Sequence, residues 1–239
     1  MIKRPFVLLF VAVGIIVAGL TLLCFLSPRE PVYQGKRLSV WLEGFDSSYH
    51  EASQAIRAMG TNAVPWLIRE LRHKDSAFKS RLMQLAGKQS LIKFDDRQTY
   101  RRRMRAIAAC EALGPAAKRA IPSLTELFNN PKLGVDDRAA FALARMGPEA
   151  IPPLTQALTK GRLFAQIFAA AALRVGRFDS EEVVAALVKA LNDKHPSVRR
   201  EAANTLAEMP NRPAVAVPAL IELLQDTNAD VRMAAARAL

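Results

Sequence analysis

Residues 196–239 read PSVRREAANTLAEMPNRPAVAVPALIELLQDTNADVRMAAARAL, and this stretch decides the fold. Val-Arg followed by paired alanines and a leucine occurs at Val198–Leu206 and again at Val231–Leu239, 33 residues later. The same step relates three upstream residues, Leu187, Leu191 and Asp193, to Leu220, Leu224 and Asp226. A fixed period of this size indicates an array of stacked structural repeats.

Each repeat contains two helical patterns. The first helix carries leucines four residues apart, as at Leu220 and Leu224, and a proline near its start, as at Pro218. The second helix places small or apolar residues, such as Ala202 and Leu206, on one face. One such pair cannot bury its apolar surface alone, so we expect an all-α fold, a right-handed α-solenoid of about five to six helix pairs.

The pattern recurs upstream through residues 50–239. Second helices are expected to end at glycines that close them, namely Gly60, Gly114, Gly147 and Gly176. First helices are expected to start at prolines, namely Pro65, Pro122, Pro152 and Pro218. An unusually long interval between the first two units places an insertion at about 73–100.

The segment Ala216–Leu239 resembles HEAT-like repeats, particularly the short subclass shared with phycobilisome-lyase-type proteins. That resemblance implies a ladder in which an Asp after the first helix pairs with an Arg that opens the second. The matching pairs are Asp193 with Arg199 and Asp226 with Arg232. The equivalent places upstream hold other residues, namely Asn130, Asp136 and Ala165, so we expect a structural ladder in the last two units.

The chain starts with a basic head, residues 1–5, and an uncharged run of 21 residues, 6–26. That run is long enough to cross a bilayer as a helix, so we expect a transmembrane anchor. The alternatives are a cleaved signal peptide and lipidation at Cys24. Charges on the two sides are nearly balanced. We expect the repeats outside the cytoplasm, on the periplasmic side in a bacterium.

Residues 27–49 are expected to form a short linker and a capping helix. Four apolar residues share one face of this helix, namely Leu38, Trp41, Leu42 and Phe45. They either cover the open face of the first repeat or form an aromatic contact site.

Positive charge is concentrated in one part of the chain. Of the formal net charge of +12, +8 falls between residues 69 and 105. The candidate partner-binding patch comprises Lys79, Arg81, Lys88, Lys93, Arg97, Arg101, Arg102 and Arg105. It is either a solvated face or a site for an acidic protein, anionic lipid or nucleic acid. Few aromatic residues accompany it, which disfavours nucleic acid.

The sequence lacks the common catalytic motifs. Its three histidines, His50, His73 and His195, are scattered without metal-ligand spacing. Phosphate-loop, dinucleotide and nucleophile-elbow patterns are missing. Adjacent carboxylates at 95–96 and 136–137 would not face each other on a helix. We therefore expect a protein that is not an enzyme, with no cofactor and no metal.

These observations favour a monomeric, membrane-tethered scaffold that binds a protein partner, through its concave second-helix surface or through the basic insertion. The alternative is a solenoid that binds nucleic acid or anionic lipid through residues 69–105. A weaker alternative, taken from the family resemblance, is a lyase- or chaperone-like role. Fold alone does not decide among them.

Overall fold

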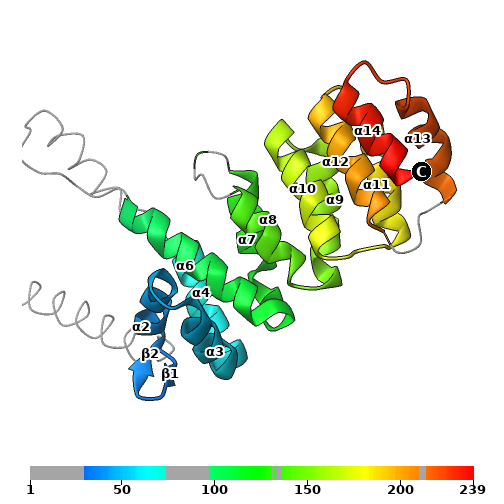
Figure 1. The fold of residues 1–239 in the computed structure, drawn as a ribbon. Helices are drawn as coiled ribbons and strands as arrows, with labels where there is room; N and C mark the ends of the chain where they lie inside the picture. The colour runs from blue at the N-terminus through cyan, green and yellow to red at the C-terminus, as the bar shows by residue number, and fades with distance from the viewer. Residues whose placement is uncertain (1–29, 74–96, 131, 133–135, 210–213) are drawn as a thin grey trace, which may run out of the picture.

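A computed structural model describes residues 30–73, 97–130, 132, 136–209 and 214–239 (Figure 1). The expected membrane span, 6–26, and residues 74–96 of the insertion lie outside the described residues. In the part that is described, no helix combines the length and apolar character needed to cross a membrane.

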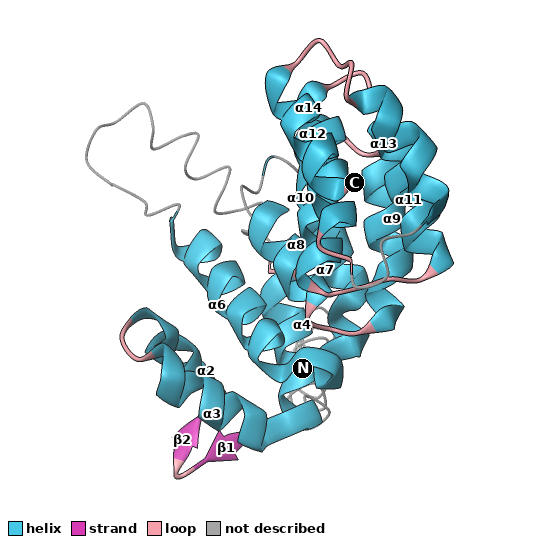
Figure 2. Ribbon diagram, turned by 45° about the vertical axis from the view of Figure 1, so that its right-hand side comes forward, coloured by secondary structure: helices cyan, strands magenta, loops and turns pink. Residues whose placement is uncertain are grey.

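The described chain is helical apart from one two-stranded hairpin (Figure 2). Strands β1 (Val32–Tyr33) and β2 (Lys36–Arg37) pair antiparallel. The α-helices are α2 (Leu38–Glu43), α3 (Tyr49–Met59), α4 (Val64–Leu71), α6 (Arg97–Leu113), α7 (Ile121–Asn129), α8 (Asp136–Ala144), α9 (Ile151–Lys160), α10 (Leu163–Val175), α11 (Glu181–Leu191), α12 (Pro196–Ala207), α13 (Val217–Leu223) and α14 (Ala229–Ala238).

The helices form two layers that run along the array. Second helices stack in the order α3, α6, α8, α10, α12 and α14, each against the next, whereas α4, α7, α9, α11 and α13 form the other layer (Figures 1 and 2). Each first helix packs against the second helix that follows it, as α7 does against α8 and α9 against α10. This is the stacked helix-pair architecture that the repeat pattern predicts.

Prolines and glycines mark the helix ends as expected, with one exception. A proline occupies the first turn of α4, α7, α9 and α13, and Gly60, Gly114 and Gly147 have positive φ angles. After α10, Gly176 is right-handed (φ −71°) and Arg177 takes the positive φ (54°). A side chain at Gly176 would collide with the ring of Phe178, so this glycine provides space.

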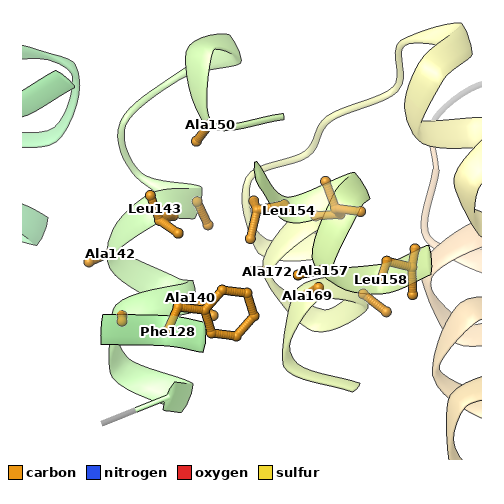
Figure 3. Packing of buried hydrophobic residues seen from close by; sticks show 14 of the residues in the cluster. Phe128, Ala140, Ala142, Leu143, Ala150, Leu154, Ala157, Leu158, Ala169 and Ala172 are labelled. Carbon is orange, nitrogen blue, oxygen red and sulfur yellow. The ribbon is translucent and has the colours of Figure 1, made fainter. Parts of the chain in front are cut away.

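One continuous apolar core runs between the two layers. Alanines such as Ala140 and Ala169 are fully buried in the second helices and allow close packing. Phe128, Leu143 and Leu154 point into the space between α7/α8 and α9/α10 (Figure 3). The core therefore lies between the two helices of each unit and continues into the neighbouring units.

The segment before the array packs onto its first helices. Leu38 and Leu42 of α2 are buried, and Trp41 and Phe45 are half-buried against the same core. The Trp41 indole Nε1 donates a hydrogen bond to the Tyr33 carbonyl oxygen (3.1 Å), and the Lys36 ammonium lies 4.9 Å from the indole centroid. These contacts make α2 and the hairpin a cover for the array.

The ladder residues form hydrogen bonds, but they connect differently from the expected pairs. Arg199 Nε and Nη2 donate to the Asp226 carboxylate of the next unit (2.7 and 2.8 Å). Within its own unit Arg199 instead donates to the Asp193 carbonyl oxygen (2.9 Å). Arg232 likewise donates to the Asp226 carbonyl oxygen (2.8 Å). The side-chain pair therefore joins neighbouring units.

The ladder also extends one unit further upstream than expected. Gln166, rather than Ala165, lies one 33-residue step before Arg199, and its amide donates to Asp193 Oδ2 (2.8 Å). The same amide donates to the Leu158 carbonyl oxygen of its own unit (3.1 Å). Gln166 thus binds both its own loop and the next unit, as Arg199 does. The side chain of Asp136 lies outside the described residues.

We expect Asp226→Asn to lower the free energy of unfolding by about 1–3 kcal/mol at neutral pH, because it leaves Arg199 without a carboxylate. The Arg199 hydrogen bonds hold the pKa of Asp226 below its usual 3.8. The carboxylate's contribution is therefore complete above that value and is lost as pH falls through the lower folded pKa.

Urea unfolding followed by circular dichroism between about pH 7 and pH 2.5 tests this expectation, since the difference from the wild type should shrink on acidification. Asp230→Asn is the matched control, because its carboxylate is 59% exposed and lies 3.6 Å from Arg200. We expect it to cost less than about 0.5 kcal/mol. A pH-independent difference for Asp226→Asn would contradict the proposed role.

Candidate interaction surface

The predicted basic patch is only partly visible in the described structure. Arg101 and Arg102 are exposed on α6. The remaining members apart from Arg105 have side chains outside the described residues, namely Lys79, Arg81, Lys88, Lys93 and Arg97.

Arg105 is part of the N-terminal packing rather than of a free patch. Its guanidinium makes a two-pronged pair with the Asp46 carboxylate, through Nε to Oδ1 (3.1 Å) and Nη2 to Oδ2. This hydrogen bonding lowers the pKa of Asp46 and raises the pKa of Arg105. Arg105 therefore ties α6 to the turn that follows α2, and its role in binding a partner stays a prediction.

The outer surface of the second-helix layer carries an apolar face that sequence reasoning did not single out. On α10, Phe164 is 60% exposed and its ring stacks on Phe168, with ring centroids 6.4 Å apart. We call this surface the α8–α10 face. Its apolar members are Phe141, Phe164, Ile167, Phe168 and Val175.

Positive charge borders this apolar face on the α8 side. Arg138 on α8 and Arg145 directly after it are exposed and make no ion pair with the described residues. Asp137, on the same helix, is half-buried. Asp136 also belongs to this helix, so its two carboxylates balance the two arginines in number. The positive charge is therefore local to the exposed Arg138 and Arg145, which can attract an acidic group.

The α12 side of the face is polar and internally neutralised. Arg174 of α10 pairs with Glu201 of α12 (3.2 Å) and with Glu208 directly after that helix (3.0 Å). Arg200 of α12 pairs in turn with Asp230 of α14. These ion pairs leave the α8 edge as the side with unpaired arginines.

Comparison of the repeats with one another could have found the α8–α10 face. One 33-residue step relates Phe164 to Ser197 and Phe168 to Glu201. A position that is polar in one repeat and aromatic in the preceding one is a surface position with an unusual residue. Apolar periodicity alone assigns such phenylalanines to the core.

Residue types that can bind metals or act as nucleophiles are scattered over the described residues. Within the described ranges, no three His, Cys, Asp or Glu side chains are grouped so as to hold a metal ion. Burial raises the pKa of the Cys110 thiol to about 12, so it is protonated and unreactive at neutral pH. His50 lies at the surface and shares a hydrogen bond with Gln54 (2.9 Å).

Two family descriptions match the array. Residues 164–239 match HEAT repeats, and residues 137–160 match the PBS lyase HEAT-like repeat. The units from α8 to α14 therefore contain HEAT-like repeats, and the resemblance expected from residues 216–239 is confirmed for them. No curated protein sequence matched the chain.

Two solved structures with some similarity are crystal structures of engineered proteins from the Northeast Structural Genomics Consortium. The first is 21% identical, and the match covers 84% of this chain and 94% of the engineered chain, with a TM-score of 0.42. The second is 22% identical, covers 85% of this chain and 97% of its own, and has the same TM-score of 0.42.

We expect Arg105→Ala to lower the free energy of unfolding by about 0.5–1 kcal/mol, since Arg105 is 21% exposed and Asp46 is 53% exposed. Arg101→Ala, one turn earlier on α6, is the control and should change stability by less than about 0.5 kcal/mol. Chemical unfolding of both variants provides the comparison. Equal stabilities would show that the Arg105–Asp46 pair contributes nothing to holding the cover.

Proposed function

We propose that this chain is a membrane-tethered, non-catalytic repeat scaffold that binds a protein partner through the α8–α10 face. The observation that carries the proposal is the stacked pair Phe164 and Phe168 at the surface of α10. The neighbouring helix α8 and its C-terminal end carry the exposed Arg138 and Arg145, which pair with no described carboxylate. Aromatic and arginine side chains supply most of the energetically important contacts in protein interfaces.

The chemistry of the face favours an amphipathic helix with acidic residues as the partner segment. Phe164 and Phe168 are one turn apart on α10 and form an apolar ridge along that helix. An apolar stripe on a partner helix could lie along this ridge, as in other helix-in-groove interfaces. Acidic residues beside that stripe would then meet Arg138 and Arg145, which increases the rate of association.

Site-specific crosslinking tests the location of the interface. A photoreactive benzoylphenylalanine replaces Phe164 in one variant and Ile221 in a matched control, because Ile221 is 54% exposed on α13 in the other helix layer. We expect one protein to crosslink from position 164 and not from position 221. Identical crosslinks from both positions would argue against the α8–α10 face.

Binding of the purified crosslinked partner then tests the energetics. Phe164→Ser introduces the residue found at the equivalent position 197 and should raise Kd about 10- to 30-fold. Ile221→Ser should leave Kd unchanged. Thermal unfolding of both variants confirms that the fold is retained. An unchanged Kd for Phe164→Ser would refute the proposed binding role.

Membrane tethering is a proposal that rests on the uncharged run 6–26. The described structure starts at Glu30, four residues after that run, so the repeats would lie close to the bilayer. Nucleic acid or anionic lipid remains the second candidate partner, favoured by the exposed Arg101 and Arg102. A lyase- or chaperone-like role, hinted at by the PBS lyase HEAT-like match, remains a weaker alternative.

The topology of the chain separates these candidates. A reporter that is active on one side of the membrane only, fused after Leu239, should report the outside. That result favours a protein or lipid partner in the envelope and excludes nucleic acid. An inside result would overturn the proposed orientation and make nucleic-acid binding, with its steep salt dependence, the leading alternative.

A further inference from the structure

The loops after α7, α11 and α13 share one local hydrogen bond. In each, a side-chain Oδ1 accepts from the backbone N–H two residues later. Asp193 accepts from His195 (2.8 Å) and Asp226 accepts from Asn228 (2.8 Å). Asn130 accepts from Lys132 in the same way (3.2 Å). Asn130 therefore occupies the place of the ladder aspartates.

The other terminal atom of the side chain, Oδ2 in the aspartates and Nδ2 in Asn130, distinguishes Asn130 from the aspartates. Asp193 and Asp226 direct Oδ2 to the residue 27 positions earlier, Gln166 or Arg199. The residue 27 positions before Asn130 is Arg103. The second atom of Asn130 is an amide nitrogen, which donates and cannot accept a hydrogen bond from arginine.

Arg103 is otherwise placed like the ladder arginines. Its Nη2 donates to the His73 carbonyl oxygen (2.6 Å), as Arg199 and Arg232 donate to the carbonyl oxygens of Asp193 and Asp226. Its Nε, the atom that binds Asp226 in the case of Arg199, is buried and has no hydrogen-bond partner among the described residues. Arg103 also makes no ion pair with a described carboxylate.

A cavity between α4, α6 and α7 is lined by both residues. Arg103 and Asn130 line it together with Arg72, Ser123 and Glu126. Arg72 Nε donates to Ser123 Oγ (2.9 Å), which fixes a second guanidinium at the cavity wall. Among the described residues, two guanidinium groups and an amide N–H₂ border the space, together with one carboxylate, that of the exposed Glu126.

We propose that this cavity binds a carboxylate group, which accepts hydrogen bonds from Arg103 and Asn130 in the position that the Asp226 carboxylate has beside Arg199. Planar guanidinium groups bind carboxylates through two parallel hydrogen bonds. The carboxylate comes either from a small free acid or from an acidic side chain of a partner. This site is independent of the α8–α10 face.

Nitrogen-15 NMR of the arginine Nε–H groups tests the site directly, with the full chain in detergent micelles. Sodium acetate should shift the Arg103 Nε–H resonance to saturation, whereas sodium chloride at equal ionic strength should not. A tetrapeptide with a single aspartate provides the second probe. Tighter saturation by the peptide assigns the site to a partner side chain, and equal or weaker saturation assigns it to a free acid.

Asn130→Asp is the decisive variant, because it supplies the carboxylate from within the chain. We expect it to abolish the saturable shift and to raise Tm by about 2–4 °C, since the introduced carboxylate would pair with Arg103. Arg103→Gln should also abolish the shift, whereas Arg102→Gln, at the exposed neighbouring position, should retain it. Glu126→Gln should likewise leave the shift in place.

Two results would overturn the proposal. The first is an unchanged acetate titration and Tm in Asn130→Asp. The second is an Arg103 Nε–H resonance that already matches that of Arg199 before any acid is added, which would mean that the chain supplies its own carboxylate.

Discussion

Each helix pair in this chain has apolar residues on more than one side, and only the neighbouring pairs can cover them. This requirement explains the alanines of the second helices, such as Ala139, Ala169 and Ala202, which are fully buried where neighbouring units meet. Larger residues, such as Leu143, fill the space between the layers. Because stacking uses the inner and lateral faces of each second helix, the outer face carries no such requirement and its residues can differ between units.

The ladder adds hydrogen bonds that connect the loops of neighbouring units. Arg199 binds the carbonyl oxygen of its own loop and the carboxylate of the next unit, so one side chain fixes two loops. Gln166 makes both kinds of contact with one amide nitrogen, because its N–H₂ group donates two hydrogen bonds, one to the Leu158 carbonyl oxygen and one to the Asp193 carboxylate. The replacement of Asp by Asn at position 130 removes the acceptor and preserves the turn. The turn and the link between units are therefore separable properties of one position.

The sequence was sufficient to predict the helix pairs, because proline near a helix start and glycine after a helix end depend on local backbone geometry. The sequence alone did not identify the carboxylate that pairs with Arg199, because one Asp lies six residues earlier and another lies 27 residues later, and the sequence does not distinguish between them. The role of Arg105 depends on Asp46, which packing brings near from outside the repeat. Phe164 was missed because its exposure depends on which helix face the neighbouring units leave uncovered.

Some residues that depart from the repeat pattern are paired within the fold, and others are not. Arg105 looked like surplus charge, yet Asp46 neutralises it, so the fold accounts for that residue. Arg103 follows the repeat, but the partner expected at position 130 is changed, and its buried Nε is left without an acceptor. Phe164 and Phe168 replace a serine and a glutamate found one unit later, and they expose apolar surface to water. A buried donor without a hydrogen-bond partner lowers the stability of the fold, and an exposed aromatic pair leaves apolar surface in water. No contact among the described residues offsets either cost. These two departures, the buried Nε of Arg103 and the exposed Phe164–Phe168 pair, are the observations on which the two proposed binding sites rest.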